Sequence, residues 1–302
     1  MATSGEAERA SEAWTIRRVI TWGTEDLKKR GIGSPRLEVE LLLGLVLKMT
    51  RVQLVIDADR PLAQAELDRY KALHKRRRTG EPVAYLTGVR EFYGRPFRVD
   101  ARVLIPRPDT EILVETALAR TKHVSLSARV LDLCTGSGCV AITIGRERPT
   151  ARVIAIDISK DALSLAQENA LRLGAVNVGF LLGDLFAPLG PPGRVRFDLI
   201  TANPPYIPDE EIPKLQQDVR DFEPKLALAG GPDGLDIVRR IVTDAPSYLD
   251  EGGCLAIEVA LGQAQAAREL FVKRGFREVE ITRDLGGIER VVSGIFGDRI
   301  PG

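Results

Sequence analysis

The sequence predicts an α/β fold in which a Rossmann-like, mostly parallel sheet of seven strands follows a small all-helical domain. From about residue 110, short apolar stretches alternate with amphipathic stretches, which is typical of a parallel sheet covered by helices on both faces. The first 80 or so residues show helical spacing only. Around residues 90–105 the hydrophobic period changes to two, which indicates a hairpin.

These patterns divide the chain into four parts. Residues 1–13 lack an apolar core and are expected to form a flexible leader. Residues 14–82 form the helical domain, which we expect to bind a partner. Residues 83–108 form a β-hairpin linker with Gly94 at its turn, and residues 109–302 form the α/β domain.

The helical domain contains three expected helices, at residues 13–31, 34–49 and 61–80. The second begins with Ser34 as N-cap and Pro35 at the first helical position. The first and third end at glycines. Together they can enclose a small apolar core.

The α/β domain contains seven expected strands separated by helices such as residues 160–173 and 235–249. The expected strands are residues 128–134, 151–157, 178–184, 197–203, 253–259, 277–282 and 289–296.

Composition excludes several classes of protein. The 302 residues carry a formal net charge of +1, so no global field favours nucleic acid or an anionic membrane. Residues 1–78 hold 16 Lys and Arg against 11 Asp and Glu, and the densest basic run, 75–78, is expected to be solvated or to contact a partner. No segment is long and apolar enough to span a membrane. We therefore expect no stable binding to nucleic acid or membrane.

Cysteine and histidine are scarce. Three cysteines and two histidines, with no CxxC pair, favour neither a disulfide framework nor a metal site. We expect a cytoplasmic protein without a metal. Nothing in the sequence demands a dimer, so a monomer is expected.

A glycine turn directly follows the first strand of the α/β domain, in "VLDLCTGSGCVA" (130–141). Gly136 and Gly138 would let the backbone approach a ligand at the start of the next helix. Asp157 ends the second strand, a spacing that suits a carboxylate bound to a ribose diol. A plain strand–helix turn is the alternative.

The acids near this turn discriminate between nucleotide cofactors. Asp132 lies in the strand before the turn, where it would repel a pyrophosphate and attract a cation. S-adenosylmethionine (SAM) carries a sulfonium and an ammonium and no phosphate. Asp184, at the end of the third strand, can accept from the adenine amino group. Each acid could be a simple cap, but three at successive strand ends predict a SAM site.

The stretch "ANPPYIP" (202–208) follows the fourth strand at the same edge of the sheet. An amide or aromatic nitrogen is a poor nucleophile, and acceptors that hold its N–H bonds can direct its lone pair at a methyl group. Asn203 offers a side-chain oxygen, Pro204 a carbonyl, and Tyr206 a ring for a planar group. A rigid turn with a buried tyrosine is the alternative.

These motifs resemble the HemK/PrmC family, the protein-glutamine N5-methyltransferases of peptide chain release factors. Five further segments match the family in order. They are "SPRLEVELLL" (34–43), "PVAYLTGVREFYG" (82–94), "VLIPRPDTE" (103–111), "FEPKLALAGGPDGL" (222–235) and "DLGGIERVVSG" (284–294). The resemblance implies a class I SAM-dependent methyltransferase that acts in translation termination. Its substrate would be the glutamine of the release factor's GGQ loop, methylated by direct in-line transfer.

The resemblance also implies site residues. The residues expected to bind the cofactor are Asp132, Cys134, Thr135, Gly136, Ser137, Gly138, Asp157, Asp184, Leu185 and Asn203. Those expected to bind the substrate are Asn203, Pro204, Pro205, Tyr206, Arg107 and Glu111, with Asn203, Pro204 and Tyr206 acting in catalysis. For Arg107 and Glu111, a turn that leads into a helix is an equal alternative.

The chain departs from the family pattern at three places. Glu258-Val259-Ala260 stands where members often have Glu-x-Gly, Leu185 replaces an aromatic, and Cys134 replaces a glycine common in methyltransferases. These departures concern cofactor affinity rather than the NPPY chemistry.

Two other enzymes fit the same motif. An N6-adenine DNA methyltransferase uses these four residues on a flipped base, but the charge of the chain disfavours it. A glutamine methyltransferase that modifies a ribosomal protein stays open. A catalytically dead SAM-binding protein is disfavoured by the intact Asn203 and Asp157.

Overall fold

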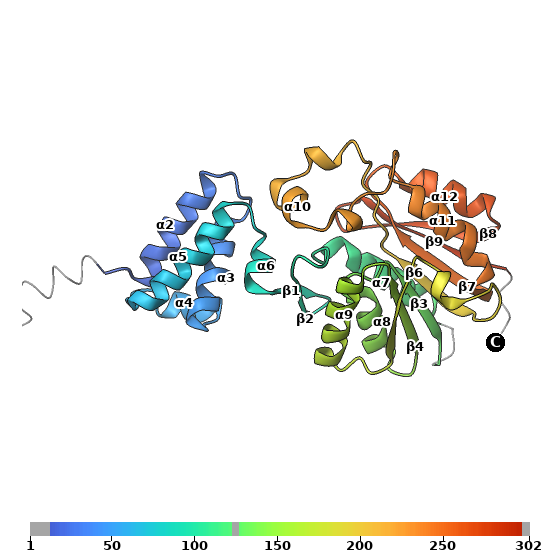
Figure 1. The fold of residues 1–302 in the computed structure, drawn as a ribbon, viewed down its shortest axis with the longest axis horizontal. Coiled ribbons are helices and arrows are strands. Elements are labelled where there is room, and N and C mark those ends of the chain that lie inside the picture. The colour runs from blue at the N-terminus through green and yellow to red at the C-terminus, as the bar shows by residue number, and fades with distance from the viewer. Residues whose placement is uncertain (1–12, 123–126, 298–302) are drawn as a thin grey trace, which may run out of the picture. The chain divides into compact units, whose positions relative to one another are not determined.

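The computed structural model describes residues 13–122 and 127–297, and the chain divides into two compact units. The N-terminal unit is Met1–Gly88 and the C-terminal unit is Val89–Gly302 (Figure 1). The N-terminal unit ends after the fifth helix, six residues beyond the expected boundary at residue 82.

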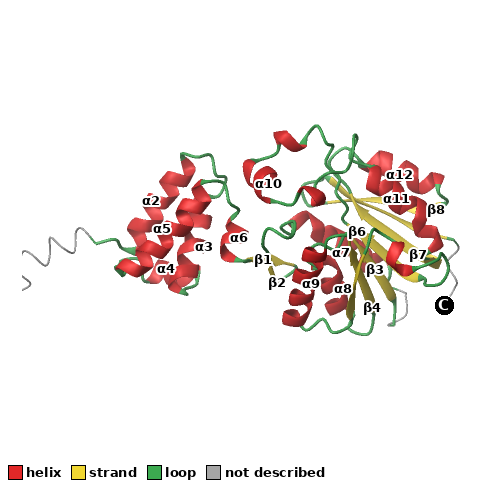
Figure 2. Ribbon diagram, viewed as in Figure 1, coloured by secondary structure: helices red, strands yellow, loops and turns green. Residues whose placement is uncertain are grey.

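Helices make up the N-terminal unit (Figure 2). They are α2 (Ile16–Lys28), α3 (Pro35–Leu47), α4 (Arg51–Ile56), α5 (Gln64–Arg78) and α6 (Val83–Thr87). The three expected helices are confirmed, whereas α4 and α6 were not expected. Helix α4 begins with a capping box in which Thr50 and Gln53 satisfy each other's backbone N–H groups. Ser34 is the N-cap of α3, but its side chain makes no capping hydrogen bond.

The helices enclose one apolar core, to which α2, α3 and α5 contribute most. Its fully buried side chains include Ile16, Val19, Leu27, Val39, Leu42, Leu43 and Tyr70. Gly23 on α2 lies where the three helices meet: a Cβ there would be 2.3 Å from Tyr70 Oη and 3.0 Å from Val39 Cγ2. This close approach requires glycine.

The basic run 75–78 is mostly paired inside the same unit. Arg76 pairs with Glu81, Arg78 with Asp26, and Arg77 is buried against Glu38 at 2.5 Å. Lys75 is exposed. The expectation that this run is solvated is wrong for Arg77, because its side chain is buried and paired with Glu38. Loss of that carboxylate would leave a buried charge without a partner, which is costly.

The C-terminal unit contains a seven-stranded sheet with the order β5-β4-β3-β6-β7-β9-β8. Its strands are β3 (Arg129–Leu133), β4 (Arg152–Asp157), β5 (Val178–Leu182), β6 (Phe197–Ala202), β7 (Leu249–Glu258), β8 (Phe276–Arg283) and β9 (Glu289–Phe296). Strands β3 to β7 are parallel, and β9 pairs antiparallel with both β7 and β8. All seven expected strands are confirmed, although β7 begins earlier than expected.

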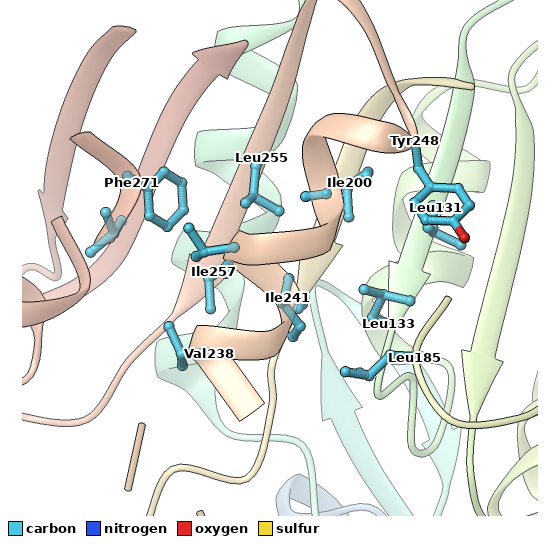
Figure 3. Close-up of a cluster of buried hydrophobic side chains, with 14 of the residues drawn as sticks. Leu131, Leu133, Leu185, Ile200, Val238, Ile241, Tyr248, Leu255, Ile257 and Phe271 are labelled. Carbon is cyan, nitrogen blue, oxygen red and sulfur yellow. The ribbon is translucent and has the colours of Figure 1, made fainter. Parts of the chain in front are cut away.

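Helices cover both faces of this sheet (Figure 1). On one face lie α7 (Glu111–Arg120), α8 (Cys139–Glu147) and α9 (Lys160–Leu173). On the other face lie α11 (Asp236–Asp244) and α12 (Ala264–Lys273), whose apolar side chains pack on Ile200, Leu255 and Ile257 of the central strands (Figure 3).

A β-hairpin, β1 (Val89–Phe92) and β2 (Arg95–Arg98), opens the C-terminal unit. Tyr93 and Gly94 form its turn, both with positive φ, and this confirms the expected position of Gly94. The hairpin is shorter than expected. Phe92 and Phe97 are buried in the core beside α7 and α8, so it is part of this unit rather than a free linker.

Short helical turns complete the C-terminal unit. They are η1 (Pro108–Thr110), η2 (Ala187–Leu189), η3 (Ile212–Lys214), α10 (Gln217–Phe222), η4 (Lys225–Ala227) and η5 (Ala245–Ser247). Of these, η3, α10 and η4 lie between β6 and α11, after the NPPY stretch. No helix among the described residues combines the length and the apolar character that a membrane span needs.

The Gly23→Ala substitution should destabilise the N-terminal unit by about 1–3 kcal/mol, because the new methyl group overlaps Tyr70. Both tryptophans of the chain, Trp14 and Trp22, lie in this unit, so tryptophan fluorescence during urea unfolding reports on it. Gly33→Ala is the matched control, since nothing lies within 4 Å of a Cβ there. Equal unfolding midpoints for the two variants would contradict the packing argument.

Candidate active site

A cavity of about 340 Å³ lies at the carboxyl edge of β3, β4 and β6 in the C-terminal unit. Its volume is in the range of small-molecule sites. The expected site residues that line it are Arg107, Asp132, Cys134, Thr135, Gly136, Ser137, Asp157, Asp184, Leu185, Asn203 and Pro205. Gly138, Pro204, Tyr206 and Glu111 do not line it.

The glycine turn after β3 is shaped for a ligand at one glycine and for packing at the other. Gly136 has φ +54, and a Cβ there would meet no atom within 4 Å, so its backbone is open to the cavity. Gly138 has φ +81, and a Cβ there would lie 2.8 Å from Ile142 Cδ1 and 3.2 Å from Ala166 Cβ. Gly138 therefore allows α8 and α9 to pack closely, and it does not approach a ligand.

Asp157 holds the glycine turn from the end of β4. Its Oδ2 accepts from the Gly136 N–H at 2.8 Å and its Oδ1 from the Ser159 N–H at 2.9 Å. Burial raises the pKa of Asp157, while these backbone bonds lower it. A carboxylate has about four lone-pair positions, so part of its capacity remains for a ligand hydroxyl group in the cavity.

Asp132 of β3 is buried at 1% exposure and binds the glycine turn through a side-chain hydrogen bond. It accepts from Thr135 Oγ1 at 2.6 Å and from Thr201 Oγ1 at 2.7 Å. Burial raises its pKa to about 6. Its carboxylate therefore ties β3 to β6 and to the turn, and it also contributes negative charge to the cavity wall.

Two positions beside the cavity have an uncommon backbone. Cys134 has φ +57 and Leu185 has φ +49, a left-handed conformation that favours glycine. The glycine that many methyltransferases have in place of Cys134 is thereby explained. Cys134, Cys139 and Cys254 form no disulfide, and burial raises the pKa of Cys134.

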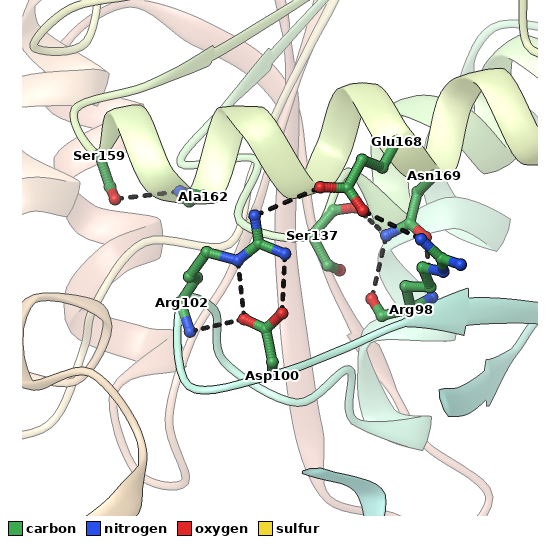
Figure 4. A network of polar contacts seen from close by, with 8 residues as sticks. All are labelled: Arg98, Asp100, Arg102, Ser137, Ser159, Ala162, Glu168 and Asn169. Carbon is green, nitrogen blue, oxygen red and sulfur yellow. Dashed lines mark hydrogen bonds and ion pairs between the residues drawn. The ribbon is translucent and has the colours of Figure 1, made fainter. Parts of the chain in front are cut away.

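A polar network connects the hairpin to the glycine turn (Figure 4). Asn169 of α9 is fully buried, and its Nδ2 donates to the carbonyl oxygens of Arg98 and Ser137, both at 3.0 Å. Arg102 lines the cavity and pairs with Asp100 and with Glu168 of α9. The segment between the hairpin and η1 is thus held against the glycine turn.

At the exit of β6, Asn203 has a defined orientation. Its Nδ2 donates to Thr110 Oγ1 at 3.1 Å, which leaves Oδ1 as the atom free to accept. Tyr206 Oη donates to Glu258 Oε1 at 3.3 Å. Sequence patterns indicated neither Thr110 nor a site role for Glu258. Thr110 lies in the segment "VLIPRPDTE" (103–111), and its place beside Arg107 and Glu111 is the one local signal that could have pointed to it.

Two glycines allow the segment 229–234 to pack directly against the backbone of Tyr206. A Cβ on Gly230 would lie 2.8 Å from Tyr206 Cα, and one on Gly234 would lie 2.2 Å from Tyr206 O. Gln263 Nε2 donates to the same oxygen at 2.9 Å. The "AGGPDG" segment is therefore a backbone clamp on the NPPY stretch.

The remaining expected site residues, Arg107, Glu111 and Asp184, have different surroundings. Arg107 lines the cavity and donates to Glu223 Oε1 at 2.7 Å, which joins the segment before η1 to the segment after α10. Glu111 is turned away, because its Oε1 accepts from the Tyr93 N–H at 2.8 Å. Asp184 accepts from Arg240 at 2.7 Å and is half exposed. Among the described residues, no group of His, Cys, Asp and Glu could hold a metal ion.

Comparisons with known proteins agree with this architecture. A family model described as the PrmC N-terminal domain matches residues 18–88, and a model described as a methyltransferase domain matches residues 125–271. The hMettl16 catalytic domain, solved in complex with MAT2A 3'UTR hairpin 6, has a TM-score of 0.57. The match covers 74% of this chain and 85% of the hMettl16 chain at 14% identity, so it supports the fold and nothing beyond it.

Two curated relatives match at much higher identity. The release factor glutamine methyltransferase of Geobacter sulfurreducens is 45% identical over 286 residues, which cover 95% of this chain and 98% of that protein. The release factor glutamine methyltransferase of Neisseria gonorrhoeae is 46% identical over 260 residues, which cover 86% and 93%. The family resemblance and the methyltransferase fold are thereby confirmed: the chain belongs to the release factor glutamine methyltransferases.

Proposed function

We propose that this chain transfers a methyl group from SAM to the side-chain nitrogen N5 of the glutamine in the GGQ motif of a peptide chain release factor. The observation that carries the proposal is the orientation of Asn203: Thr110 accepts from its nitrogen, so its oxygen is left for the N–H of a target amide. The names of the relatives, which are 40–46% identical, support release factors as substrates.

The cavity provides the cofactor half of the site. When bound, SAM supplies an activated methyl group on its sulfonium. The open backbone at Gly136 and the free lone pairs of Asp157 fit its ribose, and Asp184 with Leu185 borders the place for adenine. The negative charge of Asp132, which is buried, and of Asp157 in the cavity wall favours a cationic ligand over a phosphate.

The NPPY stretch provides the acceptor half. Asn203 Oδ1 and the carbonyl of Pro204 would accept from the two N–H bonds of the glutamine amide and fix its plane. The amide nitrogen would then present its lone pair to the methyl group. As the C–N bond forms, the C–S bond of the sulfonium would break with its electron pair left on sulfur, and the nitrogen would give up one proton to solvent. Preorganised acceptors contribute most in a site that excludes water. No strong base is required.

The N-terminal unit is proposed to contact the body of the release factor, and a monomer in the cytoplasm is part of the same proposal. The three cysteines, none of which forms a disulfide, are compatible with a reducing compartment. Because Arg76, Arg77 and Arg78 support the unit itself, the exposed Lys75 is the member of the basic run suited to a charge-reversal test.

Asn203→Ala should lower the rate of methyl transfer by about 100- to 1,000-fold, because one oriented acceptor is lost. The measurement is transfer from labelled SAM to purified release factor, with mass spectrometry to locate the methyl group. A release factor with alanine in place of the GGQ glutamine is the substrate control, and duplex DNA is assayed in parallel. Label in the DNA and none in the protein would refute the proposed function.

Asp157→Ala should weaken binding of S-adenosylhomocysteine by about 10- to 100-fold, because the ribose acceptor is lost and two backbone N–H groups lose their partner. Calorimetry measures the affinity. Asp161→Ala, on the exposed first turn of α9, serves as control and should bind normally. Unchanged affinity in the Asp157 variant would exclude this carboxylate from the cofactor site.

Gly234→Ala should lower kcat by at least about 10-fold, because a methyl group there displaces the Tyr206 carbonyl. Gly193→Ala is matched in backbone strain: its φ is +83 against +76 at Gly234, but nothing lies within 4 Å of its Cβ. Both variants should lose thermal stability from the backbone strain, and Gly234→Ala should lose more because its methyl group also meets Tyr206 and Gln263. Equal kcat values in the two variants would show that the clamp does not position Tyr206.

A further inference from the structure

Glu258 is a buried carboxyl group that the proposed chemistry does not yet use. It ends β7 at 2% exposure, directly beside the NPPY stretch. Tyr206 Oη donates to its Oε1 at 3.3 Å, whereas its Oε2 has no hydrogen-bond partner among the described residues. Burying a carboxyl group with so few partners is costly, so a purely structural role is a poor explanation.

Thr110 connects this carboxyl group to Asn203. A hydroxyl group has one proton and two lone pairs. Because Thr110 Oγ1 accepts from Asn203 Nδ2, its own proton must go to another acceptor. Glu258 is the acceptor at hand, because it already binds the Tyr206 hydroxyl group and its Oε2 is buried without another hydrogen-bond partner among the described residues. Burial raises the pKa of Glu258, and the nearby Thr110 and Tyr206 hydroxyl groups oppose that rise.

We propose that Glu258 is a positioning residue that fixes the direction of the hydrogen bonds at the methyl-acceptor site. An ionised carboxylate can only accept, so it receives the hydroxyl protons of Tyr206 and Thr110. Thr110 then can only accept from Asn203, and the Asn203 amide is held with Oδ1 toward the target. The inference rests on the proposed function, in which Asn203 Oδ1 binds the glutamine amide.

Protonation of Glu258 would remove this constraint, because the neutral acid has a proton of its own to donate to one of the two hydroxyl groups. Burial raises the pKa of Glu258 to about 7. The relay is therefore present above about pH 7 and is lost as the pH falls through the pKa of the folded protein. The polar and charged groups that face Glu258 are Thr110 and Asp109 of η1, Tyr206 after β6, Arg290 of β9 and Cys139 of α8.

The test compares variants of the full chain in methyl transfer to whole release factor. Glu258→Gln keeps the shape but brings N–H donors, and should lower kcat about 10- to 100-fold with the KM for SAM unchanged. Thr110→Val should have the same effect, whereas Thr110→Ser keeps the hydroxyl group and should restore kcat to within about 3-fold. Glu269→Gln, on an exposed position of α12, is the matched control.

Two further readouts separate positioning from packing. The Glu258→Gln/Thr110→Val double variant should be no slower than either single variant, because both changes break one relay. The kcat of the wild-type chain should fall between pH 8 and pH 6, around the pKa of about 7, whereas that of Glu258→Gln should stay flat. Carbon-13 NMR of the glutamate carboxyls, without substrate, should show a raised pKa for Glu258 that rises further in Thr110→Val.

The inference is overturned if Glu258→Gln keeps the wild-type kcat, if the two substitutions act additively, or if Thr110→Val leaves the pKa of Glu258 unmoved. Failure of the proposed function is seen separately, as a wild-type chain that does not label the release factor. In that event the NMR titration alone decides whether Thr110 and Glu258 form the relay.

Discussion

The reversal of strand order at β3 is the constraint on which the site depends. Its neighbours are β4 on one side and β6 on the other, so the chain leaves the carboxyl edge of the sheet toward opposite faces. A crevice opens between the two exits, as in other doubly wound sheets. The groups suited to the cofactor follow β3, β4 and β5, and those suited to the acceptor follow β6 and β7. Each half of the reaction is thereby assigned to one side of β3.

Sequence patterns predict what is encoded locally. The strands, the helices longer than about ten residues and the turn at Gly136 were predictable, because periodicity and glycine act over a few residues. Helices as short as α4 (Arg51–Ile56) and α10 (Gln217–Phe222) are too brief to establish a period. The NPPY motif identified Asn203, but its partner Thr110 lies 93 residues away in the chain. No spacing rule connects residues that only the folded sheet brings together.

The buried acids show the same limit. Asp132 and Asp157 could be recognised from their places in the strands, yet their hydrogen bonds to Thr201 and Gly136 depend on the register of neighbouring strands. At Cys134 and Leu185 the backbone is left-handed, at a cost of about 1–2 kcal/mol per residue. Such strain persists at functional sites where the surrounding structure determines the backbone. The left-handed backbone at these two positions could not be predicted from the local sequence, because cysteine and leucine are both compatible with an ordinary loop.

The backbone clamp on Tyr206 has a consequence for how the family can vary. The Ile207 N–H donates to Leu228 O, and the Gly230 N–H donates to Ile207 O, both at 2.9 Å. These two hydrogen bonds join the start of the segment that contains η3, α10 and η4 to its end. Lengthening a loop with joined ends adds little closure entropy, about 0.6 kcal/mol per doubling. Changes in length or charge in the exposed part of this segment, before Glu223, therefore leave the NPPY stretch in place.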